Sequence, residues 1–219
     1  RVKADVLLLE VGMGGRLDAT NILPEVLASV ITPIAFDHEE FLGKTLEKIA
    51  FEKAGIIKKK CPVIIGKQKA EALKVLEKEA KKSLAPVKIF GRDLKITKEK
   101  NGFLFEGFKK KISLPFPSLL GDHQIENASL AIAAMLTQKQ FKIEEKHIKS
   151  ALTKTFHPAR LQKITSGKFH EILPNNFELY LDGSHNPQGA ETLVEFLKTQ
   201  KNKKIFVIFS MLKDKNCEG

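Results

Sequence analysis

The sequence predicts an α/β fold built on a mostly parallel sheet. Apolar runs without polar alternation recur at residues 5–11, 25–34 and 62–66, and this is the pattern of strands buried on both faces, as in parallel sheets. Segments with helical spacing of apolar residues follow the second and third runs, at about 45–57 and 70–82. Because strands that alternate with helices pack as layers, these observations together predict an α/β layer fold.

The two helical segments each have an apolar stripe along one face. The stripe of residues 45–57 consists of Leu46, Ile49, Ala50, Ala54 and Ile57. The stripe of residues 70–82 consists of Leu73, Leu76 and Ala80. Stripes of this kind are typical of helices that pack one face against the rest of a domain.

The middle of the chain has a different pattern. Residues 95–116 form short alternating runs around Asn101-Gly102, a turn pair that favours hairpins, so we expect a small antiparallel patch there. Residues 121–136 predict a buried helix because their second half is nearly all apolar. Residues 142–154 predict a more amphipathic helix.

Pro158 marks the expected boundary between two domains. Proline disfavours a helical conformation at the residue before it, so we expect one domain over residues 1–157 and another over residues 158–219. In the second domain, residues 177–182 and 203–212 have the pattern of strands, with a helix between them over about 187–198. This order predicts the start of a second, Rossmann-like α/β unit.

The composition leaves a basic nucleic-acid-binding domain open but does not favour it. The net charge of +11 attracts phosphates at long range, but only 4 of the 37 basic residues are arginine, which is best suited to reading bases. The chain has two cysteines, Cys61 and Cys217, which form neither a CxxC motif nor the paired pattern of disulfide-bonded secreted proteins. No apolar run approaches the ~20 residues needed to span a bilayer. We therefore expect a soluble, cytoplasmic protein with reduced thiols.

Polar residues at the ends of the first two apolar runs are candidate ligand-binding groups. Glu10 precedes a glycine-rich stretch, residues 12–15, whose spacing matches neither GxGxxG nor the P-loop. Asp37 and His38 follow the second run in the same way. Ligands of open α/β sheets bind beyond the carboxyl ends of strands, and a carboxylate there suits Mg²⁺ with nucleotide phosphates. The alternative is that these are exposed polar residues in turns.

Lys53 lies inside the apolar stripe of the helix over residues 45–57 rather than opposite it. Lysine is rarely buried without a partner. The side chain could snorkel, with its stem on apolar surface and its ammonium in water. It could instead bind phosphate, or become covalently modified because burial lowers its pKa. The sequence pattern leaves both interpretations open.

The motif GDHQIENA places His123 and Asn127 on one face of a predicted helix, with Asp122 as a candidate cap. This spacing alone is a weak indication of ligand binding. A polar pair before an apolar helix is often only a feature of the helix start.

The motif LYLDGSHNPQGA places Asp182 at the end of a predicted strand, and Asn186-Pro187 suit the N-cap and first position of the next helix. Asp182 and His185 then lie near a helix N-terminus, which favours anions. A histidine in such a turn can orient phosphate or act as an acid or base. A role as a surface cap remains open.

Five stretches together resemble the folylpolyglutamate synthase and dihydrofolate synthase family of the Mur-ligase superfamily. They are EVGMGGRLDATN, FDHEEFLGKTLEKIAFEKAGIIK, GDHQIENA, HPARLQ and LDGSHNPQGA, in the family's order. The resemblance implies a Mur-ligase central ATPase domain over residues 1–157 and the start of its C-terminal domain over residues 158–219. It implies a monomeric ligase that uses ATP and Mg²⁺ and acts on small molecules, without nucleic acid or membrane. The γ-phosphate passes to a carboxylate of folate or dihydropteroate, and the amine of L-glutamate attacks the acyl phosphate.

The match also implies roles for individual residues. Glu10 and His38 resemble Mg²⁺ ligands, and Lys53 resembles a catalytic lysine that family members carry carbamylated. The remaining implied contacts are Leu17, Asp18 and Ala19 with the pteroate substrate, Asn127, Arg160 and Asp182 with ATP, and His185 with the incoming amino acid or the phosphate.

The chain departs from the family pattern in three ways. A phosphate-binding loop of the GTNGKGS kind and a folate-binding loop are expected upstream of EVGMGG and are absent, so we expect the 219 residues alone to be inactive. Ala159 stands where the family usually has glycine, and Ser184 where alanine is commoner. Another Mur-type ligase, which joins an amino acid to a different carboxylate, remains the alternative enzyme.

Overall fold

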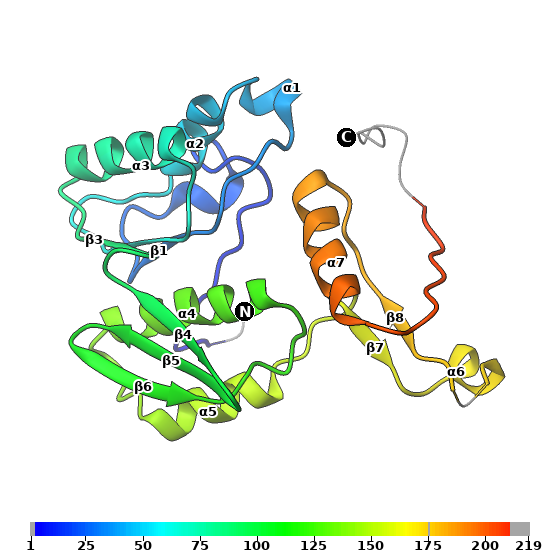
Figure 1. Ribbon diagram of the computed structural model, residues 1–219. Helices are drawn as coiled ribbons and strands as arrows, with labels where there is room; N and C mark the ends of the chain where they lie inside the picture. The colour runs from blue at the N-terminus through cyan, green and yellow to red at the C-terminus, as the bar shows by residue number, and fades with distance from the viewer. Residues whose placement is uncertain (1–2, 175, 211–219) are drawn as a thin grey trace.

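The computed structural model describes residues 3–174 and 176–210. Its elements form a larger group, from the N-terminal side to α5 (Glu145–Lys154), and a smaller group from β7 (Gln162–Ile164) onward (Figure 1). Across these described residues, every helix is too short or too polar to cross a lipid bilayer.

A three-stranded parallel sheet lies at the centre of the larger group. It consists of β1 (Ser29–Ile31), β2 (Val63–Ile65) and β3 (Val87–Ile89), with β2 in the middle. The parallel pairing confirms the strands predicted within residues 25–34 and 62–66, although β1 covers only three residues of the first run.

Helices cover both faces of this sheet (Figure 1). Helices α2 (Leu46–Ala54) and α3 (Ala70–Lys82) pack together on one face, and α4 (Asp122–Thr137) contacts β1 and β2 on the other. The side chains of β2 alternate accordingly: Val63 and Ile65 belong to the core with α2 and α3, whereas Ile64 belongs to the core with α4. All three side chains are fully buried, as expected for a central parallel strand.

The predicted antiparallel patch is confirmed. Strands β4 (Lys95–Glu99), β5 (Gly102–Gly107) and β6 (Lys110–Leu114) form a separate sheet. Glu99 pairs with Gly102, so the turn between β4 and β5 is at Lys100-Asn101, one residue before the predicted pair Asn101-Gly102. Phe103 and Phe105 of β5 are fully buried against α4 and α5. Each buried aromatic ring of this size contributes roughly 1.5–3 kcal/mol to folding, so this second core attaches the patch firmly to α4.

The smaller group contains an antiparallel pair of strands and a long helix. Strand β7 pairs with β8 (Leu179–Leu181), a short helix α6 (Lys168–Ile172) lies between them in the chain, and α7 (Pro187–Thr199) follows. The predicted helix over residues 187–198 is confirmed. The antiparallel β7–β8 pair was not predicted, because the three residues of β7 have no clear alternating pattern.

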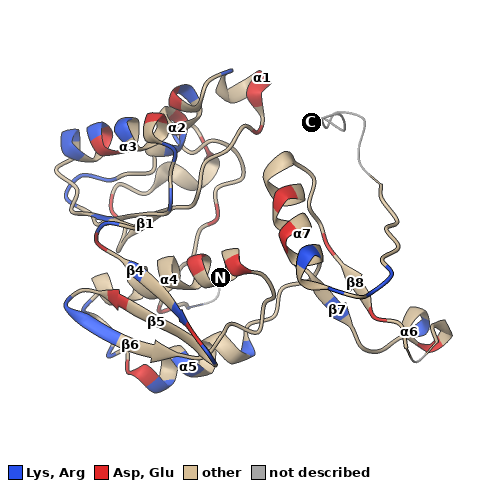
Figure 2. Ribbon diagram, viewed as in Figure 1, with Lys and Arg blue, Asp and Glu red and all other residues tan. Residues whose placement is uncertain are grey.

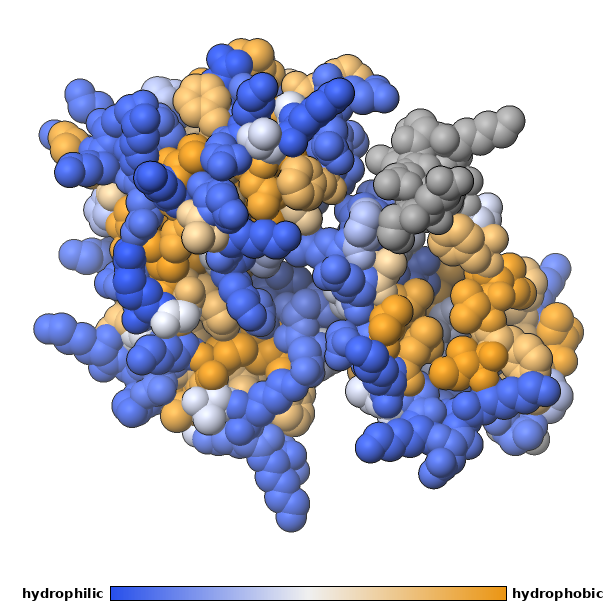
Figure 3. Space-filling view, turned by 45° about the horizontal axis from the view of Figure 1, so that its top comes forward, coloured by the Kyte–Doolittle hydropathy of each residue, from blue (hydrophilic) through white to orange (hydrophobic). Residues whose placement is uncertain are grey.

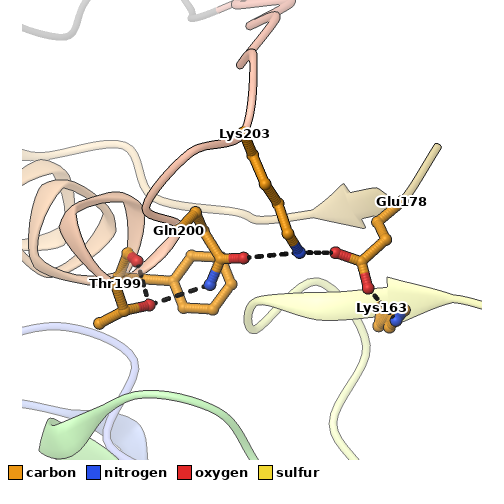
Figure 4. A network of polar contacts seen from close by, with 6 residues as sticks. Lys163, Glu178, Thr199, Gln200 and Lys203 are labelled. Atoms are coloured by element: carbon orange, nitrogen blue, oxygen red, sulfur yellow. Dashed lines mark hydrogen bonds and ion pairs between the residues drawn. The ribbon is translucent and has the colours of Figure 1, made fainter. Parts of the chain in front are cut away.

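A charged cluster connects the ends of this smaller group (Figure 4). Lys163 of β7 and Lys203 after α7 both donate to the carboxylate of Glu178, and Lys203 also donates to Oε1 of Gln200 at 3.1 Å. The side-chain hydrogen bonds from Lys163 and Lys203 lower the pKa of Glu178 to about 2.

Two of the predicted strands are wrong. Residues 5–10 and 203–210 are not in strands, and Leu8 and Ile208 are almost fully exposed. Residues 211 and 212 lie outside the described residues. A strand needs a neighbour that pairs with its backbone N–H and C=O groups, and neither segment has such a neighbour among the described residues. An apolar pattern alone was therefore not sufficient.

Of the two predicted helix caps, Asn186 is confirmed and Asp122 is wrong. Asn186 caps α7, because its Oδ1 accepts a 2.9 Å hydrogen bond from the N–H of Gly189, and Pro187 takes the first helical position. Asp122 does not cap α4: Gly121 is the N-cap residue, and the Asp122 carboxylate instead pairs with Lys98.

The surface carries charges of both signs. Figure 2 shows acidic and basic residues mixed along α3 and around the larger group. Ion pairs on this surface include Lys82–Glu79, Arg92–Glu77 and Lys149–Glu145. Figure 3 shows apolar side chains gathered over the smaller group, where the exposed residues include Phe177, Leu181, Val194 and Phe206.

Candidate active site

The carboxylate of Asp37 joins two parts of the chain that are 149 residues apart. Asp37 lies after β1 and just before the short helix α1 (Glu39–Leu42). The side-chain Nδ2 of Asn186, at the start of α7, donates a 3.3 Å hydrogen bond to Oδ2 of Asp37. The loop that follows β1 and the N-terminus of α7 therefore meet at one place, and of the predicted site residues His38 and Lys53 lie near it.

His38 has an unusual backbone conformation next to Asp37. Its φ is 50°, in the left-handed region, and its N–H donates a 2.9 Å hydrogen bond to Oδ1 of Asp37. The imidazole Nε2 lies 3.8 Å from the same oxygen, and the ring is partly exposed. Asp37 thus holds the backbone of His38 by a hydrogen bond, and its carboxylate lies near the His38 ring.

Lys53 lies in the last turn of α2 and is partly buried. Burial lowers the pKa of Lys53, and the negative charge of Asp37 opposes part of that shift. The ammonium of Lys53 is therefore within electrostatic reach of Asp37. A lowered pKa increases the fraction of neutral amine, the form of lysine that reacts with electrophiles.

Glu10 is exposed and forms no hydrogen bond or ion pair with another described residue. Likewise, residues 3–174 and 176–210 contain no cluster of three or more His, Cys, Asp or Glu side chains able to hold a metal ion. Mg²⁺ at a nucleotide needs only one or two protein ligands, because waters and phosphates complete its shell. The carboxylates of Glu10 and Asp37 and the imidazole of His38 are suitable donors for such a site. The structure brings His38 and Lys53 to Asp37 but does not bring Glu10 into contact with them.

Asp18 organises the loop that follows Glu10. Its Oδ2 accepts hydrogen bonds of 3.0 Å from the N–H groups of Gly12 and Met13, and its Oδ1 accepts bonds from the hydroxyl and N–H of Thr20 at 2.6 and 2.9 Å. The side-chain bond from Thr20 and the backbone bonds lower the pKa of Asp18 to about 2. Asp18 also caps the 3₁₀ helix η1 (Ala19–Ile22). Its carboxylate is thus used within the loop, where sequence reasoning predicted a substrate contact.

The neighbours of Asp18 remain available to a ligand. Leu17 is 80% exposed and Ala19 is exposed at the start of η1. The Asp18 hydrogen bonds shape the loop that carries both residues, and the loop presents them as exposed apolar side chains.

The glycines of this loop pack against α2. Gly14 has a φ of 65° and is buried, and a Cβ on Gly15 would lie 3.0 Å from the carbonyl oxygen of Glu52 and 3.2 Å from that of Lys53. The N–H of Arg16 donates a 2.8 Å bond to the Glu52 carbonyl. Gly14 and Gly15 thus let the loop reach the turn that carries Lys53.

A second cluster forms where residues 158–162 meet residues 182–184. Ala159 and Leu161 both have a left-handed φ, 54° and 47°, and Arg160 lies between them with an exposed side chain. The N–H of Gly183 donates to the Ala159 carbonyl and the N–H of Leu161 donates to Oδ2 of Asp182, each at 2.8 Å. These two bonds fix Arg160 beside Asp182.

Ser184 completes the hydrogen bonds of Asp182. Its N–H donates to Oδ1 at 2.9 Å, and its hydroxyl donates to the same oxygen. Burial raises the pKa of Asp182, but the hydrogen bonds from Ser184 and Leu161 and the charge of Arg160 outweigh it, so the net shift is downward. Asp182 is therefore held as a carboxylate at neutral pH.

The first turns of α4 approach this second cluster. Burial lowers the pKa of His123, with opposing effects from the charges of Asp182 and Arg160. A Cβ on Gly121 would lie 3.4 Å from Cδ1 of Leu161, so the start of α4 packs on the Arg160 loop. Asn127 is exposed one turn further along α4, with its Nδ2 3.2 Å from Oε1 of Gln124. The structure thus brings Arg160 and Asp182 together, and Asn127 lies one turn beyond His123 on the helix whose start packs on their loops.

His185 lies between the two clusters in the chain. Its Nδ1 is 2.9 Å from the Gly183 carbonyl oxygen, and its ring is exposed one residue before the Asn186 cap. The sequence pattern indicated Asp37 only as a candidate ligand-binding group beside His38, and it assigned no role to the side chain of Ser184. The hydrogen bonds that Asp37 forms with His38 and Asn186 were not predicted.

Surface hollows lie away from these residues. One of about 280 Å³ is lined by Leu42, Glu47, Lys48, Phe51 and Glu52, and another of about 340 Å³ lies among the charged side chains of β4, β5 and β6. Because the predicted site residues line neither hollow, the hydrogen-bonded clusters rather than these hollows indicate the site.

Comparison with known proteins gives concordant results. The family model for the Mur ligase middle domain matches residues 1–135. The dihydrofolate synthase/folylpolyglutamate synthase of Bacillus subtilis is 38% identical, over 97% of this chain and 49% of that protein. The folylpolyglutamate synthase of Lacticaseibacillus casei is 33% identical, over 98% of this chain and 50% of that protein. The chain thus spans about half the length of these curated relatives.

Solved structures agree. An FPGS–AMPPCP–folate complex superposes with a TM-score of 0.80 at 32% identity, over 90% of this chain and 48% of the other. E. coli FolC in complex with DHPP and ADP superposes with a TM-score of 0.75 at 29% identity, over 89% of this chain and 43% of the other. Both comparisons cover both groups of elements, so the α/β architecture with a parallel sheet and small antiparallel sheets is that of these structures.

Proposed function

Because this chain belongs to the folylpolyglutamate synthase and dihydrofolate synthase family of Mur ligases, we propose that the protein encoded by the complete gene is an ATP-dependent ligase. It adds L-glutamate to folate or to dihydropteroate. The substrate carboxylate takes the γ-phosphate of ATP and ADP leaves. The glutamate amine then attacks the acyl phosphate, inorganic phosphate leaves, and an amide forms.

Arg160 and Asp182, together with Asn127 on the neighbouring helix α4, form the nucleotide half of the site. The guanidinium of Arg160 offers planar donors that match phosphate oxygens, and its loop is held by hydrogen bonds to residues 182 and 183. Asp182, kept ionised, and Asn127 supply polar groups for the rest of the nucleotide. Phosphoryl transfer depends mainly on positioning and charge neutralisation, and a prearranged cluster of this kind provides both.

The groups around Asp37 form the phosphoryl-transfer half. Mg²⁺, when bound with the nucleotide, neutralises phosphate charge, and Glu10 and His38 are its proposed protein ligands. Lys53 is proposed to be carbamylated, and its lowered pKa supports this because carbamylation needs the neutral amine. The modification converts a partly buried ammonium into an anion suited to a site that holds a cation.

The substrates are proposed to enter from two sides. Leu17 and Ala19, exposed on the loop held by Asp18, contact the pteroate part. His185, exposed before α7, faces the incoming amino acid or the transferred phosphate. Its imidazole can accept the proton that the attacking amine releases.

The observation that best supports the proposal is the meeting of the β1 end with the N-terminus of α7, through Asp37 and Asn186. The test is ADP release by the complete gene product with Mg²⁺ and ATP. We expect release only when L-glutamate and either folate or dihydropteroate are both present, together with a product heavier by one glutamate. Release that ignores the pterin substrate but follows another amino acid or carboxylate would indicate a different Mur-type ligase. A cytoplasmic location and a monomeric state remain predictions of the sequence.

A further inference from the structure

We propose that Asp37 is a positioning residue that couples the placement of α7 to the His38 and Lys53 side of the site. In this role its carboxylate keeps His38 and Lys53 in their working positions only while Asn186, at the start of α7, is bound to it. The kinetic part of this inference rests on the proposed ligase function, whereas the structural part does not.

On the α7 side, the position of the Asn186 side chain depends on the position of α7. Its Oδ1 is used to cap α7 through the N–H of Gly189 at 2.9 Å, and its Nδ2 donates to Oδ2 of Asp37 at 3.3 Å. Because the capping bond fixes the amide relative to the helix axis, any shift of α7 moves the Nδ2 donor. Between described side chains, no other hydrogen bond joins residues 3–156 to residues 159–210.

The geometry on the strand side makes Asp37 the common partner of two catalytic candidates. Its Oδ1 accepts the N–H of His38 at 2.9 Å and so supports a left-handed backbone that is unfavourable for a residue other than glycine. Its charge also faces Lys53. Among the contacts with described residues, Oδ1 thus binds the backbone of His38 and Oδ2 binds the side chain of Asn186 at the start of α7.

The chemistry of the pair allows a sharp test by exchanging the two side chains. In Asp37→Asn, the new amide oxygen can still accept from His38, but the new NH₂ group then faces the NH₂ group of Asn186 and the link is lost. In Asn186→Asp, the new carboxylate still caps α7 well, but it faces the carboxylate of Asp37. In the double variant, the amide at position 37 donates to the carboxylate at position 186, and the link is restored with donor and acceptor exchanged.

The first measurement is the distance between spin labels on α3 and α7, placed at the exposed positions Lys78 and Glu195, in the complete gene product with its native cysteines, Cys61 and Cys217 among them, replaced by serine. We expect each single variant to broaden the distance distribution and the double variant to narrow it again. Glu191→Gln, at an exposed acid on α7, is the control and should leave the distribution unchanged. Single variants with the parent distribution would overturn the proposal, whatever their activity.

The second measurement is kcat for glutamate addition in the same four proteins. Each single variant should lower kcat more than it changes KM for ATP. The kcat of the double variant should be ~5-fold or more above the value expected if the two single losses simply multiplied. A purely structural role predicts additive losses that follow the free energy of unfolding, which would overturn the coupling. If the parent protein has no ligase activity but the distances behave as expected, the proposed function fails and the Asp37–Asn186 coupling stands.

Discussion

The backbone N–H of Leu161 donates a 2.8 Å hydrogen bond to Oδ2 of Asp182, and this bond joins two loops 21 residues apart. The other carboxylate oxygen accepts the N–H and the hydroxyl of Ser184. One side chain thus determines the shape of both loops, and Arg160 is presented from the first of them.

Asp182→Asn should weaken nucleotide binding more than it weakens folding. An amide has only one acceptor oxygen, so either the Leu161 N–H or the Ser184 N–H loses its partner, which costs about 1–3 kcal/mol for a buried group and less here because Asp182 is partly exposed. We expect KM for ATP to rise by ~10-fold or more, since the Arg160 loop loosens. Steady-state kinetics and urea unfolding measure the two effects. Asp122→Asn, at an exposed ion-pair residue, is the control, with a change within about 0.5 kcal/mol.

Ala159→Gly should stabilise the protein. Ala159 has a φ of 54°, which costs an L-residue with a Cβ ~1–2 kcal/mol, whereas glycine adopts it freely. Glycine gives the unfolded chain more conformational entropy, and this offsets part of the stabilisation. We therefore expect a net increase of about 0.5–1 kcal/mol in the free energy of unfolding. Ala151→Gly, at an exposed position inside α5, should lower it by about 1 kcal/mol. Chemical denaturation of both variants tests the opposite signs, and a destabilised Ala159→Gly protein would contradict the strain argument.

The Glu178 cluster should make stability depend on acidic pH. The pKa of Glu178 falls from 4.5 to about 2 on folding, so the folded state favours the ionised form. The stabilisation is therefore fully present above about pH 4.5 and is lost as the pH falls towards 2. Glu178→Gln should flatten the decrease in unfolding free energy between these pH values. Glu126→Gln, at an acid for which no ion pair is found among the described residues, is the matched control and should leave the slope as in the parent protein.

Glu10→Ala should reduce turnover strongly without affecting folding. Glu10 is exposed and forms no hydrogen bond with another described residue, so we expect its removal to change the free energy of unfolding by less than about 0.5 kcal/mol. Because Glu10 is a proposed Mg²⁺ ligand, its loss should nevertheless lower kcat by ~100-fold and raise the Mg²⁺ concentration needed for half-maximal rate. Glu25→Ala, at an exposed acid nearby in the chain, should change neither quantity. Parallel losses of stability and turnover in Glu10→Ala would point to a structural role instead.

Local patterns predicted the elements that are stabilised by local burial. Residues 62–66 and 70–82 became β2 and α3 because their apolar side chains face the two cores. Residues 5–11 have the same apolar pattern as β2, but among the described residues they have no neighbour for backbone pairing. A sequence pattern reports which side chains favour burial, and it does not report whether a partner strand is adjacent.

The site was predictable only in part for a similar reason. Lys53 could be identified because a charge inside an apolar stripe conflicts with the local helix pattern. The link between Asp37 and Asn186 could not, because each residue fits a local role, before a histidine or at a helix cap, and only the tertiary arrangement brings them together. Asp18 shows the converse: the motif indicated a substrate contact, whereas its oxygens are used by residues 12, 13 and 20 of its own loop.

Lys53→Ala should be inactive and should recover partly with small carboxylic acids. If the working form of Lys53 is carbamylated, the site needs an anion at the end of that side chain, and acetate or formate can occupy the space that alanine leaves. We expect a loss of ~100-fold or more in kcat and a saturable recovery of activity with added acid, measured at constant ionic strength. Lys48→Ala, at an exposed lysine on the same helix, is the control for general salt effects and should keep its activity. Lys53→Met separates the anion from packing, because it retains an apolar stem: activity in Lys53→Met, or recovery with chloride as large as with acetate, would mean that no carboxylate is required.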